Sequence, residues 1–272
     1  MRIVVTGAGP DSIGLATAVA LRDLGHEVVV TTRSVPVDGF AWHPLDLASR
    51  TSVAAFASWF GATYDGLDAL VNNAGIHLDL RSTWKQPQLV DGHEIHWRTN
   101  YLGTADLTRA LLPLLLSAPD PRVVHVVSKL HERGRNEAFF SAFGDGYDSW
   151  VAYGTSKLAL VHDAASLAVR HPGLRAYSLH PGSVYTHIAD RGLETAPLLG
   201  RLRALAAPLE RRMLATPAQG AETSVHCVTA PDATSGYYRR SAPAEPAPQA
   251  GDEAARAALW ARTSDWLVEE AR

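Results

Sequence analysis

Residues 2–14 read RIVVTGAGPDSIG, an apolar run followed by three glycines and a proline, and this stretch decides the fold. The run predicts a buried strand that a helix follows. Dinucleotide-binding loops join a strand to a helix in this way, and their glycines bring phosphates close to the backbone and to the helix amides. Gly7, Gly9 and Gly14 meet these needs, although their spacing is not GxGxxG and Pro10 has no amide to donate. The position of the loop favours a phosphate site over a simple turn.

Strand-like and helix-like segments alternate along the whole chain. Further apolar strands are predicted at 26–32, 67–73, 122–127 and 175–180, and helices at 12–25, 47–62, 91–117 and 150–170. Apolar strands joined by helices predict an α/β fold, a Rossmann-type doubly wound parallel sheet of about seven strands with helices on both faces. We interpret residues 1–272 as one domain, with a last helix at about 252–271.

Composition restricts the classes of protein to be considered. The 272 residues carry a net charge of −3, which gives no reason to expect nucleic acid or an anionic membrane as a partner. Cys227 is the single cysteine, so an intrachain disulfide is excluded, and its neighbours in SVHCVTA predict a buried thiol. A strand begins almost at the first residue and no apolar run is long enough to span a bilayer. We therefore expect a cytoplasmic protein without a signal peptide.

Polar or glycine-rich segments follow each predicted strand. After the glycine loop they read TTRS, NNAG, SKLH and PGSVYT. In a doubly wound sheet such segments meet at the carboxyl edge, where ligands bind. Arg33 ends the second strand, where NAD-binding sheets carry a carboxylate, and a guanidinium suits a 2′-phosphate. NADP(H) is therefore favoured over NAD(H), with a solvated surface arginine as the alternative.

Tyr153 and Lys157 share one face of the predicted helix because they are four residues apart. A nearby ammonium favours the phenolate and lowers the pKa of a tyrosine, which suits acid–base chemistry near neutral pH. Ser128 follows a strand that ends at the same edge, so it is a candidate to hydrogen-bond a substrate oxygen. Asn100 is a polar residue inside a predicted helix, where a water or a carbonyl is its expected partner.

The motifs TGAGPDSIG, NNAG, YGTSK and HPGSVYT, with Asn100 and Ser128, resemble the short-chain dehydrogenase/reductase superfamily. The tail from AQGAETSVHCV to ALWARTSDWL is similar to its retinol dehydrogenase-like and actinobacterial branch. The resemblance implies that Tyr153 is the general acid and base, that Lys157 lowers its pKa and binds the nicotinamide ribose, and that Ser128 orients the substrate oxygen. It also implies that Asn100 holds a water of a proton relay. The residues then expected to bind the cofactor are Gly7, Gly9, Ser12, Ile13, Gly14, Arg33, Asp46, Leu47, Asn73, Ala74, Gly75, Tyr153, Lys157, Pro181, Gly182, Val184 and Thr186.

The glycine loop departs from the pattern TGxxxGxG of that superfamily. Gly7 and Gly14 are seven residues apart, and Ser12 stands where the middle glycine is expected. The loop is one residue longer than usual, and the amide and hydroxyl of Ser12 are candidates to bind the pyrophosphate. Enoyl reductases also have a longer loop with a serine, but they space tyrosine and lysine more widely than Tyr153 and Lys157.

The substrate side is predicted from two segments. Five aromatic residues between Ser128 and Tyr153 either wall a pocket for a bulky apolar substrate or pack this insertion onto the sheet. They are Phe139, Phe140, Phe143, Tyr147 and Trp150. Residues 187–216 alternate leucines and arginines at helical spacing and are expected to form a mobile lid, with a membrane-touching helix as the alternative. His93 and His96 are three residues apart, which does not match the zinc-protease motif, so no metal is expected.

These features predict an NADP(H)-dependent carbonyl reductase or alcohol dehydrogenase. It would interconvert a ketone or aldehyde and an alcohol on a moderately large apolar substrate, such as a secondary metabolite. The alternatives are a biosynthetic enzyme of the same fold that catalyses cyclisation, epimerisation or dehydration, and a nucleotide-sensing regulator without catalysis. By analogy with the superfamily, we expect a homodimer or homotetramer formed through the helices at 91–117 and 150–170.

Overall fold

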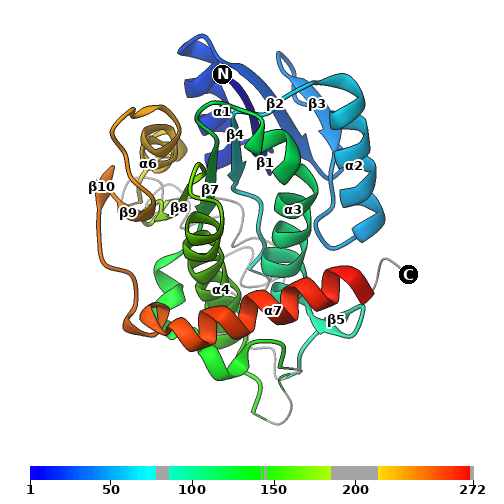
Figure 1. Ribbon diagram of the computed structural model, residues 1–272, viewed down its shortest axis with the longest axis vertical. Helices are drawn as coiled ribbons and strands as arrows, with labels where there is room; N and C mark the ends of the chain where they lie inside the picture. Colours follow the sequence, from blue (N-terminus) through cyan, green and yellow to red (C-terminus); the bar gives the residue numbers. More distant parts are fainter. Residues whose placement is uncertain (78–85, 142, 144–145, 185–213, 270–272) are drawn as a thin grey trace, which may run out of the picture.

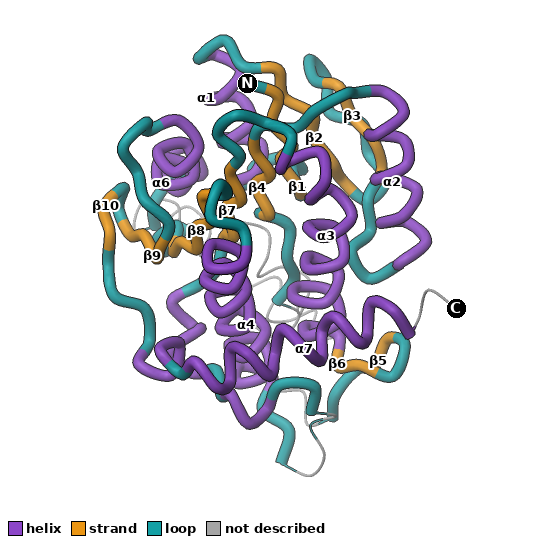
Figure 2. Tube along the Cα trace, viewed as in Figure 1, coloured by secondary structure: helices purple, strands orange, loops and turns teal. Residues whose placement is uncertain are grey.

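The computed structural model describes residues 1–272 except 78–85, 142, 144–145, 185–213 and 270–272. Its centre is an eight-stranded sheet in the order β10-β9-β8-β7-β4-β1-β2-β3 (Figures 1 and 2). The strands are β1 (Arg2–Thr6), β2 (Glu27–Thr32), β3 (Ala41–Pro44), β4 (Ala69–Asn72), β7 (Arg122–Val126), β8 (Arg175–His180), β9 (Gly236–Arg239) and β10 (Ala242–Pro243). Neighbouring strands pair in parallel except β9 and β10, which pair antiparallel. The predicted α/β fold is confirmed.

The strand order reverses at β1. This strand lies between β2 and β4, with Val4 paired to Val29 on one side and to Leu70 on the other. The chain therefore builds one half of the sheet outward from β1 through β2 and β3, and the other half from β4 onward. Such a reversal opens a crevice at the carboxyl ends of the strands, where ligands of open α/β sheets bind.

Helices cover both faces of the sheet. Helices α1 (Ile13–Asp23) and α6 (Pro217–Thr229) cover the face on which Ile3 and Val5 point into one apolar cluster. The opposite face carries Val4 in a second cluster. This face is covered by α2 (Arg50–Thr63), α3 (Gly103–Leu116) and α4 (Ser149–Arg170). No helix in the part of the chain that the structure describes is long and apolar enough to cross a membrane.

The helix predicted at 91–117 begins later than expected. A short hairpin of β5 (Leu89–Val90) and β6 (His93–Glu94) precedes it, joined by Asp91 and Gly92 at φ of 51° and 73°. Asp-Gly is a favoured pair for a two-residue hairpin turn because both positions need positive φ. A π-helix at Trp97–Leu102, which contains Asn100, then leads into α3. The Asp-Gly pair is the signal by which the sequence could have revealed this hairpin.

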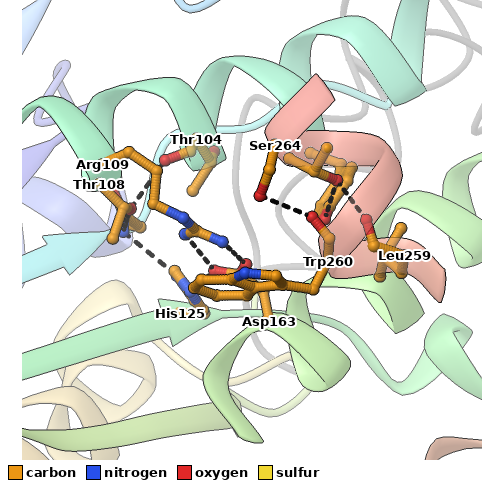
Figure 3. Close-up of polar contacts among 11 residues, drawn as sticks. Thr104, Thr108, Arg109, His125, Asp163, Leu259, Trp260 and Ser264 are labelled. Carbon is orange, nitrogen blue, oxygen red and sulfur yellow. Dashed lines mark hydrogen bonds and ion pairs between the residues drawn. The ribbon is translucent and has the colours of Figure 1, made fainter. Parts of the chain in front are cut away.

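The last helix, α7 (Glu253–Glu269), confirms the helix expected near 252–271 and crosses α3 and α4 (Figure 1). The ring of Trp260 in α7 lies over the guanidinium of Arg109, with 4.1 Å between Cζ of Arg109 and the ring centroid. Arg109 also pairs with the buried Asp163 of α4 (Figure 3). Asp163 also accepts a hydrogen bond from His125 of β7. This arrangement joins α7, α3, α4 and the sheet directly below the carboxyl edge.

Candidate active site

A cavity of about 380 Å³ lies at the carboxyl ends of β1, β2, β4, β7 and β8. The predicted site residues that line it are Gly7, Gly9, Ser12, Ile13, Arg33, Asn73, Ala74, Gly75, Ser128, Tyr153, Lys157, Pro181, Gly182 and Val184. The expected meeting of the five segments at one edge is therefore found in the structure. A second cavity of about 570 Å³ adjoins the first, because Ser128, Tyr153 and His180 are among the residues that line both.

Five of the predicted residues do not line either cavity or are not described. Gly14 and Asn100 lie behind the walls, and Thr186 is outside the described residues. Leu47 is buried in the core, where its carbonyl accepts a hydrogen bond from Arg98. Asp46 accepts a hydrogen bond from the amide of Ala48 near the start of α2. The structure thus gives Leu47 and Asp46 local structural contacts, and their expected contact with a nucleotide stays a prediction.

The cavity walls also include residues that were not among the predicted site residues. They are Pro10, Asp11, Thr32, Val126, Val127 and His180 in the first cavity, and His77, Lys129, Leu130, Glu132, Arg133 and Ser183 in the second. Most of them stand directly beside a predicted residue at the end of a strand, so the strand ends were the available signal. His77 carried no such signal, because its closest aromatic partner, Tyr153, is far away in the sequence.

The glycine loop is shaped by two close approaches and one open position. Gly7 has a φ of 70°, and a Cβ there would lie 2.8 Å from Cα of Ala74. A Cβ on Gly14 would lie 2.5 Å from Nδ2 of Asn73 and 2.6 Å from the carbonyl oxygen of Gly7. At Gly9, which lines the cavity, an added Cβ would meet nothing within 4 Å. The open backbone at Gly9 provides room for a phosphate, whereas Gly7 and Gly14 permit the packing of the loop.

Ser12 lines the cavity and also caps α1. Its Oγ donates to the carbonyl of Gly9 at 2.6 Å and accepts from the amide of Leu15 at 3.0 Å. Its amide donates to the same carbonyl at 3.3 Å. That the amide and hydroxyl of Ser12 bind the pyrophosphate stays a prediction, because Ser12 also lines the cavity. The amides of Ile13 and Gly14, in the first helical turn, have no partner within the helix and suit an anion.

The segment after β4 is fixed against the glycine loop. Asn73 donates from Nδ2 to the carbonyls of Thr6 and Gly7, at 2.9 and 3.2 Å. The amides of Asn73 and Ala74 both donate to Oγ1 of Thr6. Gly75 follows, and a Cβ there would lie 3.0 Å from Nζ of Lys157. A glycine at this position lets the lysine approach the backbone beside the cavity.

Tyr153, Ser128 and Lys157 come together where the two cavities meet. Tyr153 and Ser128 both line the two cavities, and the side chain of Ser128 acts to lower the pKa of the Tyr153 hydroxyl. The ammonium of Lys157 donates to the carbonyl of Val126 at 3.1 Å and lies 5.9 Å from the centroid of the Tyr153 ring. Both side chains are on α4, one turn apart, as the spacing predicted.

The protonation of this pair differs from the expectation. Burial raises the pKa of Tyr153 to about 12, with the hydrogen bond to Ser128 acting in the opposite direction. Burial also lowers the pKa of Lys157 to about 8. The lowered tyrosine pKa predicted from the sequence is therefore not found in this state of the protein, because burial disfavours the charged phenolate. At neutral pH the site holds a protonated phenol beside a cation.

Asn100 is buried in the π-helix and fixes the backbone after the NNAG segment. Its Oδ1 accepts from the amide of Ile76 at 2.8 Å, and its Nδ2 donates to the carbonyl of Ile76 and to Ser156. π-helical turns often occur at functional sites. A water held by Asn100, as implied by the family resemblance, stays a prediction.

The second cavity has mixed walls. It shares part of its lining with the first cavity, namely Ser128, Tyr153, His180, Gly182 and Val184. Its other lining residues are His77, Leu130 and Trp150 and the polar residues Lys129, Glu132, Arg133 and Ser183. Of the five aromatic residues of the insertion, Trp150 alone reaches this wall. Phe139 and Phe140 pack on Trp97, and Phe143 packs on Tyr147. The predicted lid at 187–216 lies outside the described residues, apart from 214–216.

The remaining candidates for chemistry are buried in structural contacts. His96 donates from Nδ1 to the buried carboxylate of Glu94 at 2.7 Å, in agreement with a packing role. No cluster of metal-ligating side chains exists among the described residues. Cys227 is fully buried, as its apolar neighbours predicted, and burial raises the pKa of its thiol to about 12.

Comparisons with known proteins agree with this geometry. The model of a family described as short chain dehydrogenase matches residues 1–196. Dehydrogenase/reductase SDR family member 13 from Bos taurus is 34% identical, with 94% of this chain and 70% of that protein aligned. Retinol dehydrogenase 11 from Homo sapiens is 32% identical over 83% of this chain and 71% of its own. The solved structure of an uncharacterized protein from Mycobacterium Paratuberculosis has a TM-score of 0.71 and 26% identity, and the alignment covers 98% and 92% of the two chains.

Proposed function

Because the chain belongs to the short chain dehydrogenase family, we propose that it is an NADP(H)-dependent oxidoreductase that interconverts a ketone or aldehyde and an alcohol. Oxidoreduction of an alcohol or carbonyl group with a nicotinamide nucleotide is the general activity of the family. The observation that carries the proposal is the placement of Tyr153, which lies with Ser128 where the two cavities meet, close to Lys157. The first cavity would hold the nucleotide and the second the substrate.

The residues fit a dinucleotide along the first cavity. Gly9 leaves space beside the first turn of α1, whose amides and dipole favour a pyrophosphate. Lys157 and Ser128 stand at the end of the cavity that adjoins the second one. A bound nicotinamide would supply or accept the hydride there.

Tyr153 acts as the acid in the reducing direction. Because burial raises its pKa to about 12, the phenol is protonated at neutral pH and able to donate to a carbonyl oxygen. Ser128 holds the same oxygen by a hydrogen bond. Lys157, a cation at neutral pH, stabilises the phenolate that remains. Oxidation of the alcohol uses these roles in reverse.

Arg33 supports the preference for NADP(H). It lines the first cavity at the end of β2, it is exposed, and the neighbouring residues Thr31, Thr32 and Ser34 carry no negative charge. A guanidinium binds a 2′-phosphate in a bidentate manner, whereas a ribose hydroxyl would need an acceptor. Arg33 therefore favours the phosphorylated cofactor.

The substrate is proposed to be moderately large and largely apolar. A cavity of about 570 Å³ with Trp150 and His77 in its wall suits a ring or a long chain next to the reacting carbon. The name of the relative retinol dehydrogenase 11 refers to such an alcohol. Lys129, Glu132 and Arg133 add polar contacts at the same cavity.

The experiment is a cofactor-dependence assay on a carbonyl panel. Purified protein is incubated with acetophenone, benzaldehyde, decanal and retinal, each with NADPH, with NADH and without nucleotide. We expect consumption of NADPH that requires the carbonyl compound, with kcat/KM at least roughly tenfold above that for NADH. Conversion of a substrate without nucleotide would instead support the non-redox alternative, and equal use of both nucleotides would remove the role given to Arg33.

A further inference from the structure

The ring of Tyr153 is covered by a histidine that no motif of the site includes. The imidazole of His77 lies parallel to the phenol, with 4.1 Å between centroids and 9° between planes. His96 approaches the same phenol edge-on at 5.9 Å and 84°. His77 is 2% exposed, so its ring excludes water from the face of the phenol that it covers.

His77 is itself held from two sides. Trp150 contacts it edge-on at 5.2 Å, and His96 does so at 5.7 Å. His96 is anchored by Glu94, a buried carboxylate. Burial opposes the ionisation of Glu94, but hydrogen bonds from His96, Tyr147 and the amide of Trp97 lower its pKa.

We propose that His77 is a positioning residue for Tyr153, acting as a flat plate that fixes the plane of the phenol so that its hydroxyl meets both Ser128 and the substrate oxygen. This inference rests on the proposed function, because His77 would position Tyr153 for its proposed role as the acid. The role depends on the shape of the ring and not on its protons. Misplacement of a catalytic group by about 1 Å reduces the rate by roughly a hundredfold.

His77 is neutral under all conditions in which the protein would be assayed. Its pKa is lowered to about 3, mainly by burial and in part by the nearby groups His96 and Lys157. A charged imidazole would repel the ammonium of Lys157, whereas a neutral ring covers the phenol without competing with it. The other titratable groups around the two rings are Glu94, Tyr147, Lys129, Glu132, Arg133 and His180. A ring without nitrogen atoms can therefore replace His77.

The test compares three replacements of His77 in the full chain, each assayed as NADPH oxidation with benzaldehyde. His77→Phe keeps the plate, His77→Leu keeps an apolar side chain without a plane, and His77→Gln keeps polar nitrogen without a ring. We expect the Phe variant to retain kcat within about threefold and the Leu and Gln variants to lose about tenfold or more. KM for NADPH should stay within about twofold in all three, because the plate covers the acid and not the nucleotide.

The pH profile of kcat separates the plate from a proton donor. In the Phe variant it should keep every inflection of the wild-type profile, since His77 does not titrate in that range. His162→Leu is the matched control, because His162 is another buried histidine, on α4, where it packs on Phe139 and is hydrogen-bonded to Asn136. It should lower the melting temperature and leave kcat unchanged.

Each outcome decides the inference. Equal kcat in the Phe and Leu variants would show that His77 only fills space. Higher kcat in the Gln variant than in the Phe variant would show that His77 acts as a polar group. An inflection of the pH profile that is lost in the Phe variant would show that His77 transfers a proton. If the Leu variant does not fold, the comparison of Phe with Gln still decides. Full activity of Tyr153→Phe in the same assay would remove the proposed function itself, which is a different result from any of these.

Discussion

His125 donates from Nε2 to Oδ2 of Asp163 across 3.1 Å, and this buried hydrogen bond joins the strand that ends near Ser128 to the helix that carries Tyr153. Nδ1 of the same ring accepts from Asn72, the residue before the Asn73 that fixes the glycine loop. Hydrogen bonds therefore join β7, α4 and the end of β4, which all carry or adjoin residues of the site. The guanidinium of Arg109 pairs with the carboxylate of Asp163.

Asp163→Asn should destabilise the fold by about 3 kcal/mol, because it leaves the guanidinium of Arg109 without its anionic partner in a largely buried position. The measurement is the free energy of unfolding in urea. Glu253→Gln is the matched control, since Glu253 forms an exposed ion pair with Arg256 and should change little. Equal stability of the two variants would show that the buried pair does not hold the walls together.

Two glycines of the loop should respond differently to the same change. Gly14→Ala introduces a Cβ that would lie 2.5 Å from Asn73 and 2.6 Å from the carbonyl of Gly7, so the melting temperature should fall. Gly9→Ala meets no atom within 4 Å but enters the space assigned to the phosphates. It should keep the melting temperature and weaken NADPH binding by roughly tenfold or more, measured by calorimetry. NADPH binding by Gly9→Ala at wild-type affinity would contradict the placement of the phosphates.

Arg33→Ala should raise the dissociation constant of NADPH by about tenfold to a hundredfold and leave that of NADH within about twofold, because the lost hydrogen bonds are charge-assisted and reach the 2′-phosphate alone. Fluorescence titration of both nucleotides gives the two constants. Arg256→Ala removes a partly buried arginine of α7 and should change neither. An equal loss of affinity for NADH and NADPH would show that Arg33 does not act through the 2′-phosphate.

Acidification should destabilise the fold already between pH 6.5 and 5. Burial lowers the pKa values of His77, His162 and His180 to about 3, 4 and 4, whereas the unfolded chain binds protons at about 6.5. The unfolded state thus binds more protons than the folded state in this window. The free energy of unfolding is therefore highest above pH 6.5, and as the pH is lowered it falls by up to about 1.4 kcal/mol per pH unit for each histidine. Melting temperatures across this range, with His162→Phe as a variant of smaller slope, test it. A flat profile would contradict the neutral state of these rings.

The fold followed from the sequence because its signals are local. The strand before Gly7, the glycine at 25 with a φ of 85° after α1, and the alternation of strands and helices each depend on neighbouring residues. The hairpin at residues 89–94 was missed because the helical pattern was extended across Asp91 and Gly92, although this pair indicates a turn.

The site was predictable to the extent that its residues follow strand ends. Arg33 and Ser128 follow strand ends and line the cavity as expected, whereas His77 has its position from packing on the ring of Tyr153, which lies on a helix distant in the sequence. The shift of the Tyr153 pKa also depended on burial, which the spacing of tyrosine and lysine does not reveal. Contacts of this kind come from tertiary structure alone.

The central claim is that Tyr153 supplies the proton while a neighbouring nicotinamide exchanges the hydride. The most direct test is the single-turnover rate of benzaldehyde reduction by Tyr153→Phe with NADPH at saturation, beside a binding titration on the same sample. The account predicts a rate lower by about a hundredfold to ten-thousandfold with NADPH affinity within about twofold of the wild type. An unchanged rate in a variant that lacks the hydroxyl would contradict it.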